Sequence, residues 1–377
     1  MDVLRLACLG MTFLSMSPSA DAAPFVLGAP RSLAARIADS RAAVIATPAG
    51  DESTDGWRVE TCLHDVTGAV AAGDVIHPTP APSPDHPAAL LLARRDRRLE
   101  AVPLTAAARD YLEELPSKSR AIEQRLPYAF SHLDHRDRIV CADAFATLAC
   151  VSGVQLRRCA ERFPVETLRT LVSSDETSDE RAGFYAYLLG LAGQRRDAAL
   201  IRHRLDGTDN GLATGAAGLI AGYLLLTGEE GLAELEGTIL MANRRTPIFV
   251  AALYEALQTL GREHPELFSP ERLRQTARCG LNRTDSVDLA IGYLASQRDW
   301  EALPEVSGAL GSDDPDPVRR RAVRIAAARF LMACRRDSDA SPARRAQAVE
   351  LLQRLAEVDA DLVRRAQRIA GGPPPRN

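Results

Sequence analysis

Residues 181–191 read RAGFYAYLLGL and residues 212–224 read LATGAAGLIAGYL. In each stretch the large apolar side chains recur at the three- and four-residue spacing of one helix face. They are Phe184, Tyr187, Leu188 and Leu191 in the first stretch, and Leu219, Ile220, Tyr223 and Leu224 in the second. An apolar helix face has to be covered by another element. We therefore predict two helices that pack against each other.

Both stretches contain glycine, although glycine inside a helix costs roughly 1 kcal/mol relative to alanine. The positions are Gly183, Gly190, Gly215, Gly218 and Gly222. A glycine has no Cβ to hold a neighbouring backbone away. We expect the backbones of neighbouring helices to approach each other closely at these positions.

Further helix starts are marked by a capping side chain that precedes a proline at the first helical position. These dipeptides are Thr246-Pro247, Ser269-Pro270, Asp316-Pro317 and Ser341-Pro342. Thr177 and Glu180 have the spacing of a capping box. The second helix of each predicted pair starts near Asp179, Asn210, Thr246, Thr284 and Asp316. These starts are 31 to 38 residues apart, a spacing typical of helical repeats.

Ahead of the helices, short apolar segments separated by turn-rich sequence predict β-strands. The predicted strands are 42–47, 57–65, 74–77 and 88–93, after a helix at 32–39 and before one at 104–115. The sequence thus predicts a mainly α protein, with a small β-barrel or sandwich domain at 25–115 and a HEAT-like α-solenoid of about seven helix pairs at 119–370. Residues 371–377, GGPPPRN, are expected to be a disordered tail.

Residues 1–22 have the features of a signal peptide. Arg5 supplies positive charge, Leu6 to Met16 form a short apolar core, and Ala20-Asp21-Ala22 offers a cleavage site. We expect a periplasmic or secreted protein with no transmembrane span after cleavage, and retention of the uncleaved segment in the membrane as the alternative. The net charge of −4 does not indicate nucleic acid as a partner.

Cleavage would leave six cysteines: Cys62, Cys141, Cys150, Cys159, Cys279 and Cys334. An even number in an oxidising compartment permits disulfides. Cys150 and Cys159 are the one candidate pair, because Ser152-Gly153 between them could reverse the chain. Buried thiols that act as small apolar side chains are the alternative.

Two segments carry a resemblance to known proteins. They are 134–140, DHRDRIV, running into 143–146, DAFA, and 217–232, AGLIAGYLLLTGEEGL. The chain resembles a set of uncharacterised exported bacterial proteins with a small N-terminal β domain of the oligonucleotide/oligosaccharide-binding (OB) type, followed by HEAT-like helices. The resemblance implies this architecture and no reaction. The proline-dense segment 78–87 departs from it.

The sequence contains no Gly-x-Ser-x-Gly elbow, phosphate-binding loop or His-Glu-x-x-His motif. The cluster of His132, Asp134, His135 and Asp137 suggests either metal ligands or a turn in which an aspartate caps a helix. His64, His77 and His86 lack a metal-binding spacing, and 313–316, DDPD, is better explained as a turn before a helix than as a calcium loop. We therefore predict no cofactor, no resident metal and no enzymatic activity.

The C-terminal helices are basic, with 14 arginines against six acidic residues from Pro317 to Asn377. Seven of these arginines could form a stripe that attracts an acidic partner. They are Arg320, Arg324, Arg335, Arg336, Arg364, Arg365 and Arg368. The alternative is an ordinary solvated helix face.

We predict that the chain is an exported binding or scaffold protein that uses its helical surface to bind a protein partner. One alternative is a β domain that binds a glycan or polyanion, with Trp57 as a stacking face. The other is a hydrolase whose site is assembled from distant residues.

Overall fold

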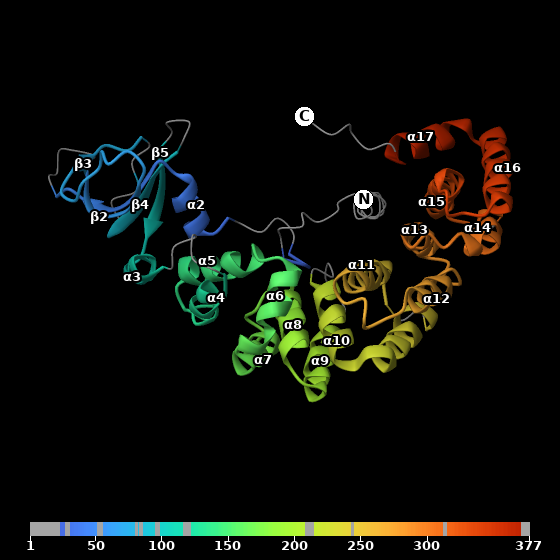
Figure 1. The fold of residues 1–377 in the computed structure, drawn as a ribbon, viewed down its shortest axis with the longest axis horizontal. Helices are drawn as coiled ribbons and strands as arrows, with labels where there is room; N and C mark the ends of the chain where they lie inside the picture. The colour runs from blue at the N-terminus through green and yellow to red at the C-terminus, as the bar shows by residue number, and fades with distance from the viewer. Residues whose placement is uncertain are drawn as a thin grey trace. The chain divides into compact units, whose positions relative to one another are not determined.

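The computed structural model describes residues 23–26, 31–50, 56–79, 82, 86–94, 99–115, 122–207, 215–242, 245–311 and 315–370 (Figure 1). The predicted signal peptide and tail lie outside these ranges. The chain forms two compact units, which meet in sequence between Pro164 and Val165. We call them the N-terminal and the C-terminal unit. The chain is mainly helical, with one antiparallel five-stranded sheet near its start.

The sheet of the N-terminal unit has the strand order β3-β2-β1-β4-β5. Its strands are β1 (Ala42–Pro48), β2 (Trp57–Asp65), β3 (Val75–Ile76), β4 (Ala88–Ala93) and β5 (Leu99–Leu104). The central strands β1 and β4 are buried on both faces, which explains their continuous apolar sequences. The sheet is curled: Trp57, Val44 and Leu91 pack on one face, and Ile45 and Leu90 pack with the helices on the other.

The four predicted strands are confirmed, although β3 is shorter than expected. One further strand was not predicted. The missed strand is β5, whose sequence LEAVPL has a proline and no regular alternation of apolar and polar residues. Pro103 is tolerated because β5 lies at the edge of the sheet and pairs only with β4. The helix predicted from Leu104 begins at Ala106, where the Thr105 side chain caps it.

Helices complete the N-terminal unit. They are α2 (Leu33–Asp39), α3 (Ala106–Glu114), α4 (Ile122–Phe130), α5 (Arg138–Ala149), α6 (Gly153–Cys159) and a 3-10 turn at Ala160–Arg162. Residues of α2, α3 and α5 share a core with the sheet; Val140 of α5 is fully buried there. The boundary expected at 116–120 lies outside the described residues, and this compact unit continues to Pro164.

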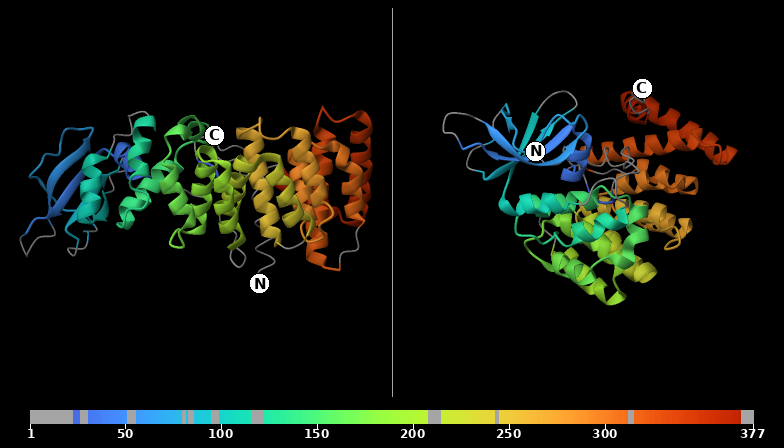
Figure 2. Two further views of the ribbon diagram at one scale, coloured as in Figure 1. Left: turned by 90° about the horizontal axis from the view of Figure 1, so that it is seen from below. Right: turned by 60° about the vertical axis from the view of Figure 1, so that its left-hand side comes forward.

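The C-terminal unit is entirely helical in its described part. Its helices are α7 (Val165–Ser173), α8 (Asp179–Ala192), α9 (Ala198–Gly207), α10 (Ala216–Leu235), α11 (Pro247–Glu263), α12 (Pro270–Gly280), α13 (Val287–Ser296), α14 (Leu303–Leu310), α15 (Pro317–Arg336), α16 (Pro342–Val358) and α17 (Ala360–Ala370). Short 3-10 helices at Arg195–Asp197 and Trp300–Ala302 and a π-helix at Glu236–Met241 join some of them. Helices of this unit lie side by side in Figure 2, with α10 packed on α8 and α11, and α15 packed on α13 and α16.

The close helix approach predicted from glycine is confirmed between α8 and α10. A Cβ at Gly190 would lie 2.7 Å from the Cα of Gly222, and a Cβ at Gly222 would overlap the carbonyl oxygen of Ala186. Gly183 is in the same relation to Gly215 and Gly218. Any larger residue at this crossing would push the two backbones apart.

All four helix starts predicted from a cap and a proline are confirmed, at α11, α12, α15 and α16. The start predicted at Thr284 lies at Val287 instead. The capping box predicted for Thr177 and Glu180 is wrong, because Ser178 is the capping residue of α8 and its side chain makes no capping bond. The start predicted at Asn210 falls outside the described residues.

Candidate interaction surface

Most arginines in the first part of the C-terminal unit are engaged in ion pairs. Between residues 165 and 311, eleven of the described arginines contact a carboxylate. They are Arg169, Arg195, Arg202, Arg204, Arg245, Arg262, Arg272, Arg274, Arg278, Arg283 and Arg298. A paired arginine offers little charge to a partner. The described residues of this part also carry 20 acidic side chains against 13 arginines, so its net charge is negative.

The arginines of α15 to α17 differ from these. Only Arg319, Arg344, Arg354 and Arg364 pair with a carboxylate in the described range 315–370. Of the seven arginines predicted to form a stripe, six have no carboxylate partner among the described residues, and Arg364 pairs with Asp361. Unpaired guanidinium groups therefore concentrate on the last three helices.

The four predicted arginines of α15 fall near the two ends of that helix, and the other three lie on α17. Arg320 lies in the first turns of α15 and Arg335 in its last, and at 1.5 Å per residue these two positions are about 22 Å apart. Between them the helix is buried by its neighbours, from Ile325 to Met332 on several faces. Since charges at a surface are screened over about 8 Å at physiological ionic strength, the two ends act as separate basic groups.

One end of α15 borders a surface depression of about 410 Å³. Ser296, at the end of α13, and Arg336, at the end of α15, both line it. Arg298, Trp300 and Asp337 line it as well. This volume falls within the range of ligand-binding clefts in proteins.

Two buried aspartates that were not predicted hold neighbouring helices together. Arg169 on α7 donates two hydrogen bonds to Asp197, at 2.8 and 3.0 Å, and Arg278 on α12 donates two to Asp299, at 2.8 and 2.7 Å. The Arg169 side chain holds the pKa of Asp197 below its usual value. A signal is present in the sequence, because QRRD at 194–197 and QRD at 297–299 each follow an apolar helix. The charged groups of each pair face each other, so these ion pairs stabilise the packing of neighbouring helices.

A third buried carboxylate, Asp143 of α5, connects helices of the N-terminal unit. It accepts hydrogen bonds from the backbone N–H of Leu33, at the start of α2, and from the hydroxyl of Tyr111 on α3, at 2.8 Å from the latter. Burial raises the pKa of Asp143 despite these bonds. Both acceptor oxygens are engaged within the fold, so Asp143 is a positioning residue for α2 and α3.

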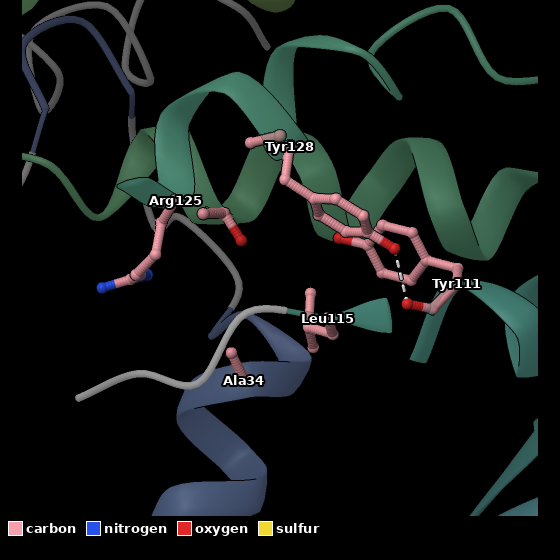
Figure 3. Close-up of a pocket in the computed structure, with 7 residues that line it drawn as sticks. Ala34, Tyr111, Leu115, Arg125 and Tyr128 are labelled. Carbon is pink, nitrogen blue, oxygen red and sulfur yellow. Dashed lines mark hydrogen bonds between the residues drawn. The ribbon is translucent and has the colours of Figure 1, made fainter. Parts of the chain in front are cut away.

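Figure 3 shows a small cavity of the N-terminal unit, lined by Tyr111, Leu115, Arg125 and Tyr128 among others. The Tyr128 hydroxyl donates to the carbonyl oxygen of Tyr111 at 2.6 Å, and burial raises the pKa of Tyr128 to about 12. The cavity volume is about 10 Å³. Such a volume holds about one water molecule, so this cavity cannot admit an organic substrate.

The cluster of histidines and aspartates at 132–137 forms a capped turn. Asp137 caps α5 by accepting hydrogen bonds from the N–H groups of Ile139 and Val140, and Thr105 donates to its other oxygen at 2.5 Å. His135 accepts a bond from the N–H of Asp137. Within the described residues no group of three or more potential ligands is placed to hold a metal ion.

The DDPD segment at 313–316 ends in a helix cap. The carboxylate of Asp316 accepts hydrogen bonds from the N–H groups of Val318 and Arg319, at 2.8 and 3.4 Å. Residues 313 and 314 lie outside the described ranges. The part of the segment that the structure describes is therefore a cap of α15, as the sequence predicts.

The structure also places Trp57, Cys150 and Cys159, which the sequence singled out. Trp57 is only 3% exposed and packs inside the sheet, so the idea that its ring stacks on a glycan is wrong. Cys150 is exposed at the end of α5, whereas Cys159 is buried in α6, and the two carry separate thiols in this structure. Their disulfide remains a prediction.

The carboxyl group of Glu255 in the C-terminal unit has a raised pKa. Glu255 on α11 is half-buried, and burial raises its pKa from 4.5 to about 7. Between these pH values the folded protein binds more protons than the unfolded chain, so its stability falls as the pH rises through this window. We expect Glu255→Gln to be more stable than the parent at pH 8, by about 1 to 2 kcal/mol, and equal to it at pH 4.

Thermal unfolding at both pH values checks this prediction. Glu350→Gln, at an exposed carboxylate paired with Arg354, serves as the control and should show no such gain at pH 8. A Glu255→Gln protein that loses stability at pH 8 would show that the carboxylate is stabilised by a partner.

In the described ranges no single helix is long and apolar enough to cross a bilayer; α5 and the segment 153–162 reach that length only together, across a bend of 102°. Comparisons of the chain with models of protein families, with curated protein sequences and with solved structures gave no match.

Proposed function

We propose that this chain is an exported, non-enzymatic scaffold that binds an acidic protein partner through the basic surface of α15 to α17. In this proposal the helices stack in the HEAT-like manner, and the curled sheet is an OB-like barrel open between β3 and β5. The strand order and the side-by-side helices support this architecture.

The observation that carries the proposal is the uneven distribution of ion pairs. Most described arginines from 165 to 311 have carboxylate partners, whereas nine of the thirteen from 315 to 370 have none among the described residues. Unpaired surface charge gives little to the stability of a fold. It does steer and orient an oppositely charged partner.

Affinity capture from a cell-envelope extract tests the proposal. The bait is the full chain, and the variant replaces the exposed Arg335, Arg336, Arg365 and Arg368 with glutamine. A control variant removes the same charge from the unit outside α15 to α17, by replacing Arg195, Arg196, Arg262 and Arg274 with glutamine. Captured proteins are identified by mass spectrometry and quantified against the parent.

We expect the parent and the control to capture acidic proteins, and the variant to recover about tenfold less of them. The reason is that four surface ion pairs are worth roughly 0.2 to 1 kcal/mol each. Capture should weaken as salt is raised. Equal capture by the two variants would contradict the proposal, as would the recovery of polysaccharide or lipid without protein.

A further inference from the structure

The depression at the ends of α13 and α15 is lined by one carboxylate, and that carboxylate is already satisfied. Asp337 accepts hydrogen bonds from the N–H of Asp339 and from the indole N–H of Trp300, both at 3.0 Å, and lies 3.5 Å from the guanidinium of Arg298. These donors hold the pKa of Asp337 below its usual value. Asp337 therefore anchors one wall of the depression.

Arg298 lies at the depression in an uncommon backbone conformation. Its φ of 52° lies in the left-handed region, which few residues other than glycine adopt. Its side chain is 65% exposed and bridges Asp337 and Asp339, with 3.0 Å to the latter. Such backbone outliers are found more often at binding sites than elsewhere, and here the outlier places a guanidinium at the rim of the depression.

Arg336 contributes a positive charge that no carboxylate of the described residues neutralises. It lines the depression and is exposed. The charge of Arg345 also lowers the pKa of Asp337. The positive charges of Arg298, Arg336 and Arg345 therefore exceed the negative charges of Asp337 and Asp339 at the depression. A planar guanidinium with unused donors is the group that best binds a carboxylate, because it can form two parallel hydrogen bonds.

We propose that this depression is the subsite in which a side-chain carboxylate of an acidic peptide segment binds, with Arg336 as its ion partner and Arg298 at the rim. The inference rests on the proposed function and specifies where the acidic partner is recognised. A carboxylate is the ligand of complementary charge, because the lining of the depression is mostly polar and its unused hydrogen-bond donors are guanidinium N–H groups.

The experiment measures binding of a fluorescein-labelled peptide of alternating glutamate and glycine to the full chain. Its C-terminus is amidated in one arm and free in the other, and a glutamine–glycine peptide is the blank. The key variant is Arg336→Gln. Arg335→Gln is the matched control, since this neighbour is exposed and carries the same charge but does not line the depression.

We expect Arg336→Gln to weaken binding of the amidated peptide by about fivefold, and Arg335→Gln by less than about twofold through long-range charge alone. Arg336→Lys should bind between Arg336→Gln and the parent, because a point charge cannot form the paired hydrogen bonds. Thermal unfolding of each variant should match that of the parent, which excludes a folding defect.

Equal weakening by the two glutamine variants would overturn the subsite and leave the basic surface as a whole intact, so the proposed function would stand. Binding of the free-ended peptide alone would also overturn it, since the ligand would then be a chain end. A parent protein that does not bind the peptide overturns the subsite, while the capture experiment still decides the proposed function.

Discussion

Replacing Gly222 with alanine is expected to lower the free energy of unfolding by roughly 3 kcal/mol, at the upper end of the cost of overpacking. The added methyl group would overlap the carbonyl oxygen of Ala186 on α8. This neighbour is backbone and cannot rotate away as a side chain could. The helices α8 and α10 would have to separate, and the close-packed contacts along their whole crossing would weaken.

Urea unfolding followed by circular dichroism measures this loss as a lower midpoint with an unchanged slope. Gly308→Ala in α14 is the control, because a Cβ there meets no atom within 4 Å. It should gain up to about 1 kcal/mol from helix propensity. If Gly222→Ala behaved like this control, the close crossing of α8 and α10 would be wrong.

This crossing could be predicted from the sequence because its cause is local. A glycine inside a helix is unfavourable by itself, so Gly183, Gly190 and Gly222 each indicate a neighbouring backbone that requires the missing Cβ. The four proline-marked helix starts were predictable for the same reason, since a cap and its helix are adjacent in sequence. Strands β1, β2 and β4 followed from apolar segments bounded by turns.

The remaining features depend on residues that are distant in sequence. Strand β5 lies at an edge and carries Pro103, so no local pattern identified it. The arginines of α15 were grouped by their spacing along the chain, whereas the packing of α15 against α13, α16 and α17 buries the middle of that helix and leaves the arginines near its ends. The depression that joins Arg298 to Arg336 requires the ends of two separate helices to meet, which no sequence spacing could indicate.

Removing the partner of a buried carboxylate is the second large effect that we expect. Replacing Arg278 with methionine should cost about 3 kcal/mol, because the side chain of Asp299 is only 2% exposed and would stay charged without its two hydrogen bonds. Methionine retains most of the volume and the helix propensity of arginine, so packing and helix formation change little. The loss should therefore report the ion pair itself.

A double-mutant cycle with Asp299→Asn separates the pair from its surroundings. The double variant should be more stable than the sum of the two single losses predicts, by at least about 1 kcal/mol, because it leaves no unpaired buried charge. Arg354→Met, at an exposed pair with Glu350, is the control and should cost less than about 0.5 kcal/mol. Additive losses in the cycle would mean that Arg278 stabilises α12 and α13 through packing, and that the arginine–aspartate sequences after α8 and α13 do not mark a stabilising ion pair.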